Sequence, residues 1–257
     1  MKRVLAISDL HCGSTVGITP PKWFKNDYHK KLWAWYVRLC AQLQPINTLI
    51  VNGDAIDGKG QKSGGTEQLT ADRNEQAEMA FEVIKATKAK QIVMTYGTPY
   101  HTGADEDWED VVLNYVRDRT HVPVRISADE SVSVNGLIFD VKHYVGGSQV
   151  PYGRFTAVSR EKMQNILWSR RGQRADADVI LRAHVHYFGY CGVPGDKYLC
   201  ITMPALQGLG SKFGASRCSG TVDQGAIWFD IESKDNWTWN NRLIPQEKDP
   251  AALYIAR

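Results

Sequence analysis

The chain has 257 residues, 43% of them hydrophobic and 23% charged, which is enough to bury the core of one α/β domain. A formal charge of +3 is too small to indicate nucleic-acid binding by bulk electrostatics. No stretch has the pattern of a signal peptide or a transmembrane helix, and the five cysteines include no C-x-x-C pair. We therefore expect a single domain over residues 1–257 in a cytoplasmic protein that does not contact the membrane.

Strand-like and helix-like segments alternate in the first half of the chain, which favours parallel strands with helices packed on the sheet. Three apolar runs predict buried strands, at residues 3–8, 47–54 and 91–97. Apolar residues at helical spacing predict three helices, which begin near Leu32, Asp72 and Trp108. The glycine-rich stretch at 58–71 has no periodicity and is expected to be a long loop.

The second half has more hairpin signals. The stretch SVSVNGLIFDVKH predicts two strands joined by an Asn-Gly turn. A helix is expected next, then a strand, a hairpin about Pro194–Asp196 and a final antiparallel pair, at residues 155–172, 177–186, 190–202 and 225–244. The fold class expected from these elements is α/β.

Five of the seven histidines lie at or just beyond a predicted strand end: His11, His101, His143, His184 and His186. Residues i and i+2 of a strand share a face, so we expect Asp9 to project with His11, and His184 with His186. Ligands at the carboxyl ends of parallel strands converge on one edge of the sheet, where Asp54 also falls.

Mixed carboxylate and imidazole ligands suit Mn, Fe or Zn, and this set is larger than one ion needs. Two ions that share a carboxylate would use the surplus and form the clamp that favours phosphoester hydrolysis. Each motif alone is as well explained by a turn or a satisfied core histidine. Their occurrence together, each after an apolar strand, favours a dinuclear site.

These motifs resemble those of the calcineurin-like metallophosphoesterases. The pattern appears as Asp9-Leu10-His11, Gly53-Asp54-Ala55-Ile56-Asp57, a lone His143 and Ala183-His184-Val185-His186, over residues 4–190. The resemblance implies two mixed β-sheets packed as a sandwich and flanked by helices. It assigns Asp9, His11 and His186 to one metal, His143 and His184 to the other, and Asp54 to both. It also places His101 near the leaving group, with Asp57 holding its imidazole by a hydrogen bond.

The third block departs from the family's Gly-Asn-His. The chain has Gly97-Thr98-Pro99-Tyr100-His101 instead, so the ligand Asn is absent and the histidine comes two residues late. Thr98 would offer a weaker oxygen ligand in that place, or Asp105 or Glu106 would fold back onto the metal. A compact chain with this block resembles members carried by phages or prophages.

The resemblance implies a metal-dependent hydrolase in which two divalent ions, foremost Mn²⁺ with Fe, Zn or Mg as alternatives, supply a hydroxide for in-line attack. Phosphodiesters of nucleic acid or nucleotides are the expected substrates. Lys59, Tyr100 and Arg154 are the candidate substrate contacts, and the loop at 58–71 is expected to act as a lid. The alternatives are a phosphomonoesterase for small molecules or phosphoproteins and a non-catalytic metal-binding scaffold of the same fold.

Overall fold

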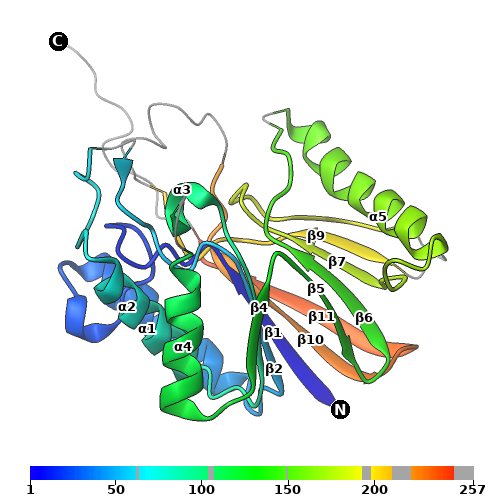
Figure 1. The fold of residues 1–257 in the computed structure, drawn as a ribbon, viewed down its shortest axis with the longest axis horizontal. Helices are drawn as coiled ribbons and strands as arrows, with labels where there is room; N and C mark the ends of the chain where they lie inside the picture. The colour runs from blue at the N-terminus through cyan, green and yellow to red at the C-terminus, as the bar shows by residue number, and fades with distance from the viewer. Residues whose placement is uncertain (62–63, 104–106, 149, 193–197, 210–220, 246–257) are drawn as a thin grey trace.

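Two β-sheets packed face to face form the centre of the molecule (Figure 1). This is a computed structural model, and it describes residues 1–61, 64–103, 107–148, 150–192, 198–209 and 221–245. The strand orders are β11-β10-β1-β2-β3-β4 in one sheet and β5-β6-β7-β9-β8 in the other. Both sheets are mixed, so the expected sandwich is confirmed.

The first sheet has a parallel centre, made by β1 (Lys2–Ser8), β2 (Thr48–Asn52), β3 (Ile92–Thr95) and β4 (Val124–Ser127). Two antiparallel strands extend it beyond β1, namely β10 (Gly225–Ser233) and β11 (Asn236–Leu243). Every residue of β2 and β3 is buried, because helices cover one face of the sheet and the second sheet covers the other.

Three helices pack on the outer face of the first sheet: α1 (Asp27–Gln42), α2 (Arg73–Ala86) and α4 (Glu109–Thr120). They lie where the apolar periodicity predicts them. Asp72 caps α2 by accepting a hydrogen bond from the Asn74 amide at 2.9 Å. His29 of α1 is fully buried, and its Nε2 donates to the Thr15 carbonyl at 2.9 Å.

The second sheet contains β5 (Asp129–Val134), β6 (Leu137–Lys142), β7 (Val179–Arg182), β8 (Gly189–Cys191) and β9 (Leu199–Thr202). The predicted hairpin joins β5 to β6, and Asn135 and Gly136 both have the positive φ of a two-residue turn. The tip at Pro194–Asp196 lies outside the described residues. Helix α5 (Arg154–Arg170) covers the outer face of this sheet (Figure 1).

The core fills the space between the sheets and the space under α1, α2 and α4. Phe139 of β6 and Phe229 of β10 meet edge to face across the sandwich, with ring centroids 5.0 Å apart. Sequence reasoning missed β4 and three single-turn helices, η1 (Pro21–Trp23), α3 (Pro99–Thr102) and η3 (Pro151–Gly153), because such short elements show no periodicity. Among the described residues, none of the helices is both long and apolar enough to cross a bilayer.

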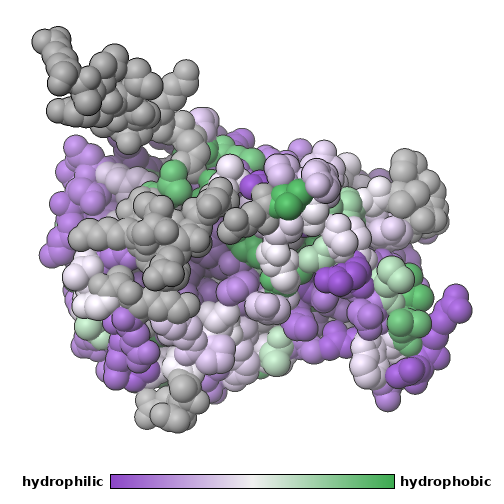
Figure 2. Space-filling view, turned by 90° about the horizontal axis from the view of Figure 1, so that it is seen from above, coloured by the Kyte–Doolittle hydropathy of each residue, from purple (hydrophilic) through white to green (hydrophobic). Residues whose placement is uncertain are grey.

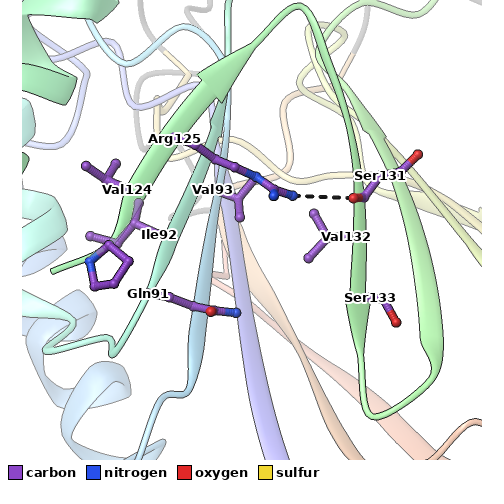
Figure 3. A pocket seen from close by; sticks show the side chains of 9 residues that line it. Gln91, Ile92, Val93, Val124, Arg125, Ser131, Val132 and Ser133 are labelled. Atoms are coloured by element: carbon purple, nitrogen blue, oxygen red, sulfur yellow. Dashed lines mark hydrogen bonds between the residues drawn. The ribbon is translucent and has the colours of Figure 1, made fainter.

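An open groove of about 330 Å³ separates the sheets where β4 and β5 run side by side as edge strands (Figure 3). Val93 and Val132 form part of its floor, and the Arg125 guanidinium spans it to the Ser131 carbonyl at 3.3 Å. None of the metal-motif residues lines it. The groove is therefore separate from the candidate site described next.

Candidate metal centre

The metal-motif residues follow the carboxyl ends of β1, β2, β6 and β7. The prediction that Asp9 and His11, and His184 and His186, project from a continuing strand is wrong. β1 ends at Ser8 and β7 ends at Arg182, so all four residues lie in the loops that follow. Five of the metal-motif residues have left-handed backbone conformations: Asp9, His11, Asp54, His184 and His186, with φ between 44° and 72°. Non-glycine residues seldom adopt this conformation except where a site constrains them.

Backbone hydrogen bonds hold these strained turns together. The amide of Asp9 donates to the Gly53 carbonyl at 3.1 Å, and the amide of His11 donates to the Asp54 carbonyl at 3.0 Å. A Cβ on Gly53, which has a φ of 71°, would lie 2.4 Å from the His143 ring. The loops after β1 and β2 are thus registered against each other, and their side chains point to one place.

Three overlapping groups of metal-ligating atoms form there, and one of them, His11, Asp54 and His101, shares a residue with each of the other two. Asp9, His11 and His186 bring ligand atoms within 4.8 Å of one another, and so do Asp54, His143 and His184. In the first group, Nε2 of His186 is 3.2 Å from Asp9 Oδ1 and 3.2 Å from Nε2 of His11. In the second, Nε2 of His143 is 3.0 Å from Asp54 Oδ2.

In His11 and His143, an acceptor holds the Nδ1 nitrogen, and this fixes the direction in which the Nε2 lone pair points. Nδ1 of His11 contacts the Asp57 carboxylate at 2.8 Å, and Nδ1 of His143 donates to the Asn52 carbonyl at 2.8 Å. When a ring is neutral and Nδ1 carries its proton, the ring turns an Nε2 lone pair toward the centre. This is the arrangement by which proteins orient histidine ligands of metals.

The electrostatics of the cluster favour a cation. Burial alone would raise the pKa of Asp9, but His186 and His143 outweigh it and lower the pKa to about 2. Burial alone would lower the pKa of His143, but the Asp54 carboxylate outweighs it and raises the pKa to about 10. The buried carboxylates therefore remain ionised and draw positive charge toward themselves.

The residues fit divalent metal ions. Asp9 Oδ1 is a buried oxygen that accepts no well-formed hydrogen bond from the described residues. Facing lone pairs on His11 and His186 would repel each other unless a proton or a metal lay between them. Nitrogen and carboxylate donors together suit Mn, Fe or Zn.

His101 lies beside this cluster but is held differently from expectation. Its Nδ1 donates to the backbone carbonyl of Asp57 at 2.9 Å, whereas the Asp57 carboxylate, 3.6 Å away, makes its hydrogen bond with His11. The His11 and His101 rings pack edge to face with centroids 4.5 Å apart. Burial and the charge of His11 lower the pKa of His101, which keeps its imidazole neutral.

The divergent third block also reaches the site. Thr98 donates twice to Asp54, from its amide to Oδ1 at 2.7 Å and from its hydroxyl to Oδ1 at 3.1 Å. Its hydroxyl thus orients the carboxylate that would bridge two metals. The other candidates for this position, Asp105 and Glu106, lie outside the described residues.

Glu109 is a site-supporting residue that sequence reasoning missed. Its carboxylate is fully buried and accepts hydrogen bonds from the amides of Ala55 at 2.8 Å and Gly97 at 2.6 Å. Burial and then the negative charge of Asp54 raise the pKa of Glu109 to about 8. Its sequence signal is an acidic residue in the first turn of α4. Exposed acidic residues are common at that position, so the signal does not indicate a buried carboxylate.

The candidate substrate contacts lie at different depths. Tyr100 is half-buried, with its ring centroid 4.7 Å from that of His101, and Lys59 is exposed in the loop after β2. The Arg154 guanidinium lies 4.9 Å above the Tyr187 ring, which directly follows His186. Tyr187 is itself 4% exposed, so it supports Arg154 and offers no face to a substrate.

The loop at 58–71 is anchored to the site at its far end. The Gln68 amide donates to the Asp57 carboxylate, and Gln76 of α2 donates to the carbonyls of Gly58 and Thr70, both at 2.8 Å. Residues 62–63 lie outside the described part of the chain. These contacts explain how the loop is held, while its role as a lid stays a prediction.

No protein-family model matches the sequence, and no curated protein sequence matches it. Solved structures do resemble it. An archaeal phosphodiesterase has a TM-score of 0.50 and 16% identity, over 94% of this chain and 99% of that chain. Vps29 from Entamoeba histolytica, complexed with zinc, has a TM-score of 0.46 and 12% identity, over 94% and 98%. The Haemophilus influenzae NAD nucleotidase NadN has a TM-score of 0.44 and 12% identity, over 95% of this chain and 49% of that chain.

The first likeness shows the fold. The chain has the metallophosphoesterase fold, with two mixed β-sheets flanked by helices. The donor groups at the edge of its sheets add a cluster of histidines and aspartates that could hold metal. Fold and cluster together define a metallophosphoesterase-fold protein with a candidate metal centre.

Proposed function

We propose that this protein hydrolyses phosphodiesters of nucleic acid or nucleotides with the help of two divalent metal ions, Mn²⁺ foremost. One observation carries the proposal: two groups of ligand atoms, each within 4.8 Å, lie next to each other, and a third group takes His11 from one and Asp54 from the other. His143 Nε2 of the second group lies 4.0 Å from Asp9 Oδ1 of the first. The first metal would be held by Asp9, His11 and His186. The second would be held by His143 and His184, with Asp54 shared between them.

Bound metal ions would activate water and neutralise the phosphate oxygens. The protein's own residues supply the remaining functions. The His101 ring rests neutral, with Nδ1 donating to a carbonyl and a lone pair on Nε2. Nε2 would take up a proton from water, which makes the ring cationic, and pass that proton to the leaving oxygen. Asp57 orients His11 and, through its carbonyl, His101. Arg154, Lys59 and Tyr100 are proposed to contact the substrate.

The test is hydrolysis of bis-p-nitrophenyl phosphate beside p-nitrophenyl phosphate in the presence of Mn²⁺. We expect the diester to be the better substrate, and both His184→Ala and His101→Ala to lower its turnover. His184→Ala removes a ligand and should also lower the metal content, whereas His101→Ala should lose about 10²–10⁴-fold in kcat and keep its metal.

Three results would contradict parts of this proposal. Faster turnover of the monoester would favour a phosphomonoesterase. Bound metal without turnover of either compound would favour a scaffold. Full activity in His101→Ala would remove that residue from the reaction.

A further inference from the structure

The exposed apolar side chains of the molecule are concentrated in one segment. Eleven large hydrophobic residues are exposed in the described parts of the chain, and seven of them lie between residues 144 and 168. They are Tyr144, Val150, Tyr152, Phe155, Met163, Leu167 and Trp168. Apolar side chains gathered in this way on a surface indicate a binding function.

The same segment is strongly basic. Residues 144–171 contain four arginines and one lysine against a single acid, Glu161. Glu161 is engaged with Arg182 at 2.8 Å, and Lys162 with Asp176 at 2.7 Å. The charges left on the outer face of α5 and its end are therefore positive, from Arg160, Arg170 and Arg171, all exposed.

Helical geometry places four of these residues on one side of α5. Arg160, Met163, Leu167 and the C-cap residue Arg171 follow one another at i, i+3, i+7 and i+11, so they lie along one face of the helix and its end. The Arg171 guanidinium lies 5.6 Å from the Trp168 ring. Figure 2 shows hydrophobic and hydrophilic residues intermixed over the half of the molecule that carries α5. We call the seven apolar residues and the three exposed arginines the α5 strip.

The α5 strip begins at the metal centre. The ring of Tyr144, 56% exposed, packs on the ring of the proposed ligand His184 with centroids 4.9 Å apart. Tyr152, 87% exposed, stands just before Arg154 at the start of the helix. The 17 residues of α5 then continue the strip for about 25 Å away from the site (Figure 1).

We propose that the α5 strip binds single-stranded nucleic acid and holds a polynucleotide substrate whose scissile phosphate lies at the metal centre. Exposed aromatic rings stack on bases of any sequence, and arginines follow the phosphate backbone. This combination fits a polyanion with planar bases better than a purely apolar partner. The inference rests on the proposed function, because it names the substrate class of the same site.

The experiment measures binding and chemistry separately. Binding of a fluorescein-labelled oligothymidylate of about 12 nucleotides is followed by anisotropy at several salt concentrations. Arg160→Gln/Arg171→Gln should weaken binding and reduce the salt slope by about 1.4, which is the loss of two phosphate contacts. Trp168→Ala should weaken binding about tenfold or more through lost stacking. The matched control is Arg38→Gln/Lys90→Gln, which removes two exposed charges from the α1 side of the molecule.

Hydrolysis of bis-p-nitrophenyl phosphate separates the two proposals. It is too short to reach the α5 strip, so its turnover should be unchanged in the strip variants, while KM for the oligonucleotide rises. If the strip variants bind the oligonucleotide with the same affinity as the wild-type protein, the inference is overturned and the proposed function still stands. A Trp168→Ala variant that binds the oligonucleotide normally but changes its oligomeric state would also overturn the inference, since the strip would then be a self-association face. Binding without any turnover would support the strip and count against the proposed function.

Discussion

Glu109 connects the two loops that present Asp54 and Thr98. Its two oxygens accept the amides of Ala55 and Gly97, which lie after β2 and β3 respectively. Gly97 itself must lack a side chain, because a Cβ there would lie 2.1 Å from Asp54 Oδ1. At the scale of single residues, the site therefore depends on a carboxylate that contacts no proposed ligand side chain and a glycine that leaves room for one.

Replacing Glu109 should destabilise the protein without touching a ligand. Glu109→Ala leaves the buried Ala55 amide and the half-buried Gly97 amide without their acceptor, so we expect the free energy of unfolding to fall by about 2–5 kcal/mol, measured by urea denaturation. Glu109→Gln keeps one acceptor and should cost less. Asp118→Ala, an exposed acid of the same helix, is the control and should change stability by about 0.5 kcal/mol or less. Equal stability of Glu109→Ala and the control would contradict this role.

Helix α5 is attached to the second sheet mainly by polar contacts. Its apolar contact with the sheet is a small cluster that includes Val158 and Ile180. Beneath it, Arg182 of β7 pairs with the buried Asp140 of β6 at 2.8 Å and with Glu161 of α5 at 2.8 Å. At the scale of elements, this network holds the middle of α5 on the second sheet.

Breaking this network should be costly. Arg182→Ala leaves the Asp140 carboxylate in a buried position with fewer partners, so we expect a loss of about 3–5 kcal/mol in the free energy of unfolding. The double variant Arg182→Ala/Asp140→Ala also removes the buried carboxylate and should recover part of the lost free energy of unfolding. The control is Arg125→Ala, which breaks an ion pair with Glu130 whose arginine is largely exposed and should cost about 1 kcal/mol or less. A small effect of Arg182→Ala would show that α5 is held by other contacts.

At the scale of the whole molecule, the stability of the fold and metal binding at the candidate centre should both depend on protonation. The pKa of His143 is raised from its ordinary value of 6.5 to about 10, mainly by Asp54 against the effect of burial. A raised pKa stabilises the fold fully below the unfolded value and loses that contribution as the pH rises through the folded value. The metal-free protein should therefore become less stable between about pH 7 and pH 10.

Stabilisation by a bound metal should have the opposite pH dependence, because a metal ion binds only the neutral imidazole. We expect Mn²⁺ to raise the melting temperature, by more at about pH 9 than at about pH 6, and chelation to reverse the gain. Differential scanning calorimetry across this pH range checks both dependences. His143→Gln should remove most of the pH dependence of the Mn²⁺ effect. A melting temperature indifferent to Mn²⁺ at every pH would count against a metal centre.

Much of the fold followed from local patterns. The apolar runs and helical periodicities located β1, β2, β3 and the helices α1, α2, α4 and α5, because these elements bury whole faces and so need regular apolar spacing. The Asn135-Gly136 turn followed from the requirement for positive φ. Short elements such as β4 and α3 are held by neighbours, so no local pattern marks them.

The candidate ligands were identifiable because metal chemistry limits the residue types, and the strand ends limit where they can meet. How they meet depends on contacts between segments far apart in the chain. Three features arise only when the loops after the strands pack together. Asp9 and His184 adopt left-handed turns, the Asp57 carboxylate bonds to His11 while its backbone carbonyl accepts from His101, and Glu109 is buried. Such long-range contacts leave no periodic trace in a sequence, so tertiary structure alone defines the site's geometry and the strip that leads from it.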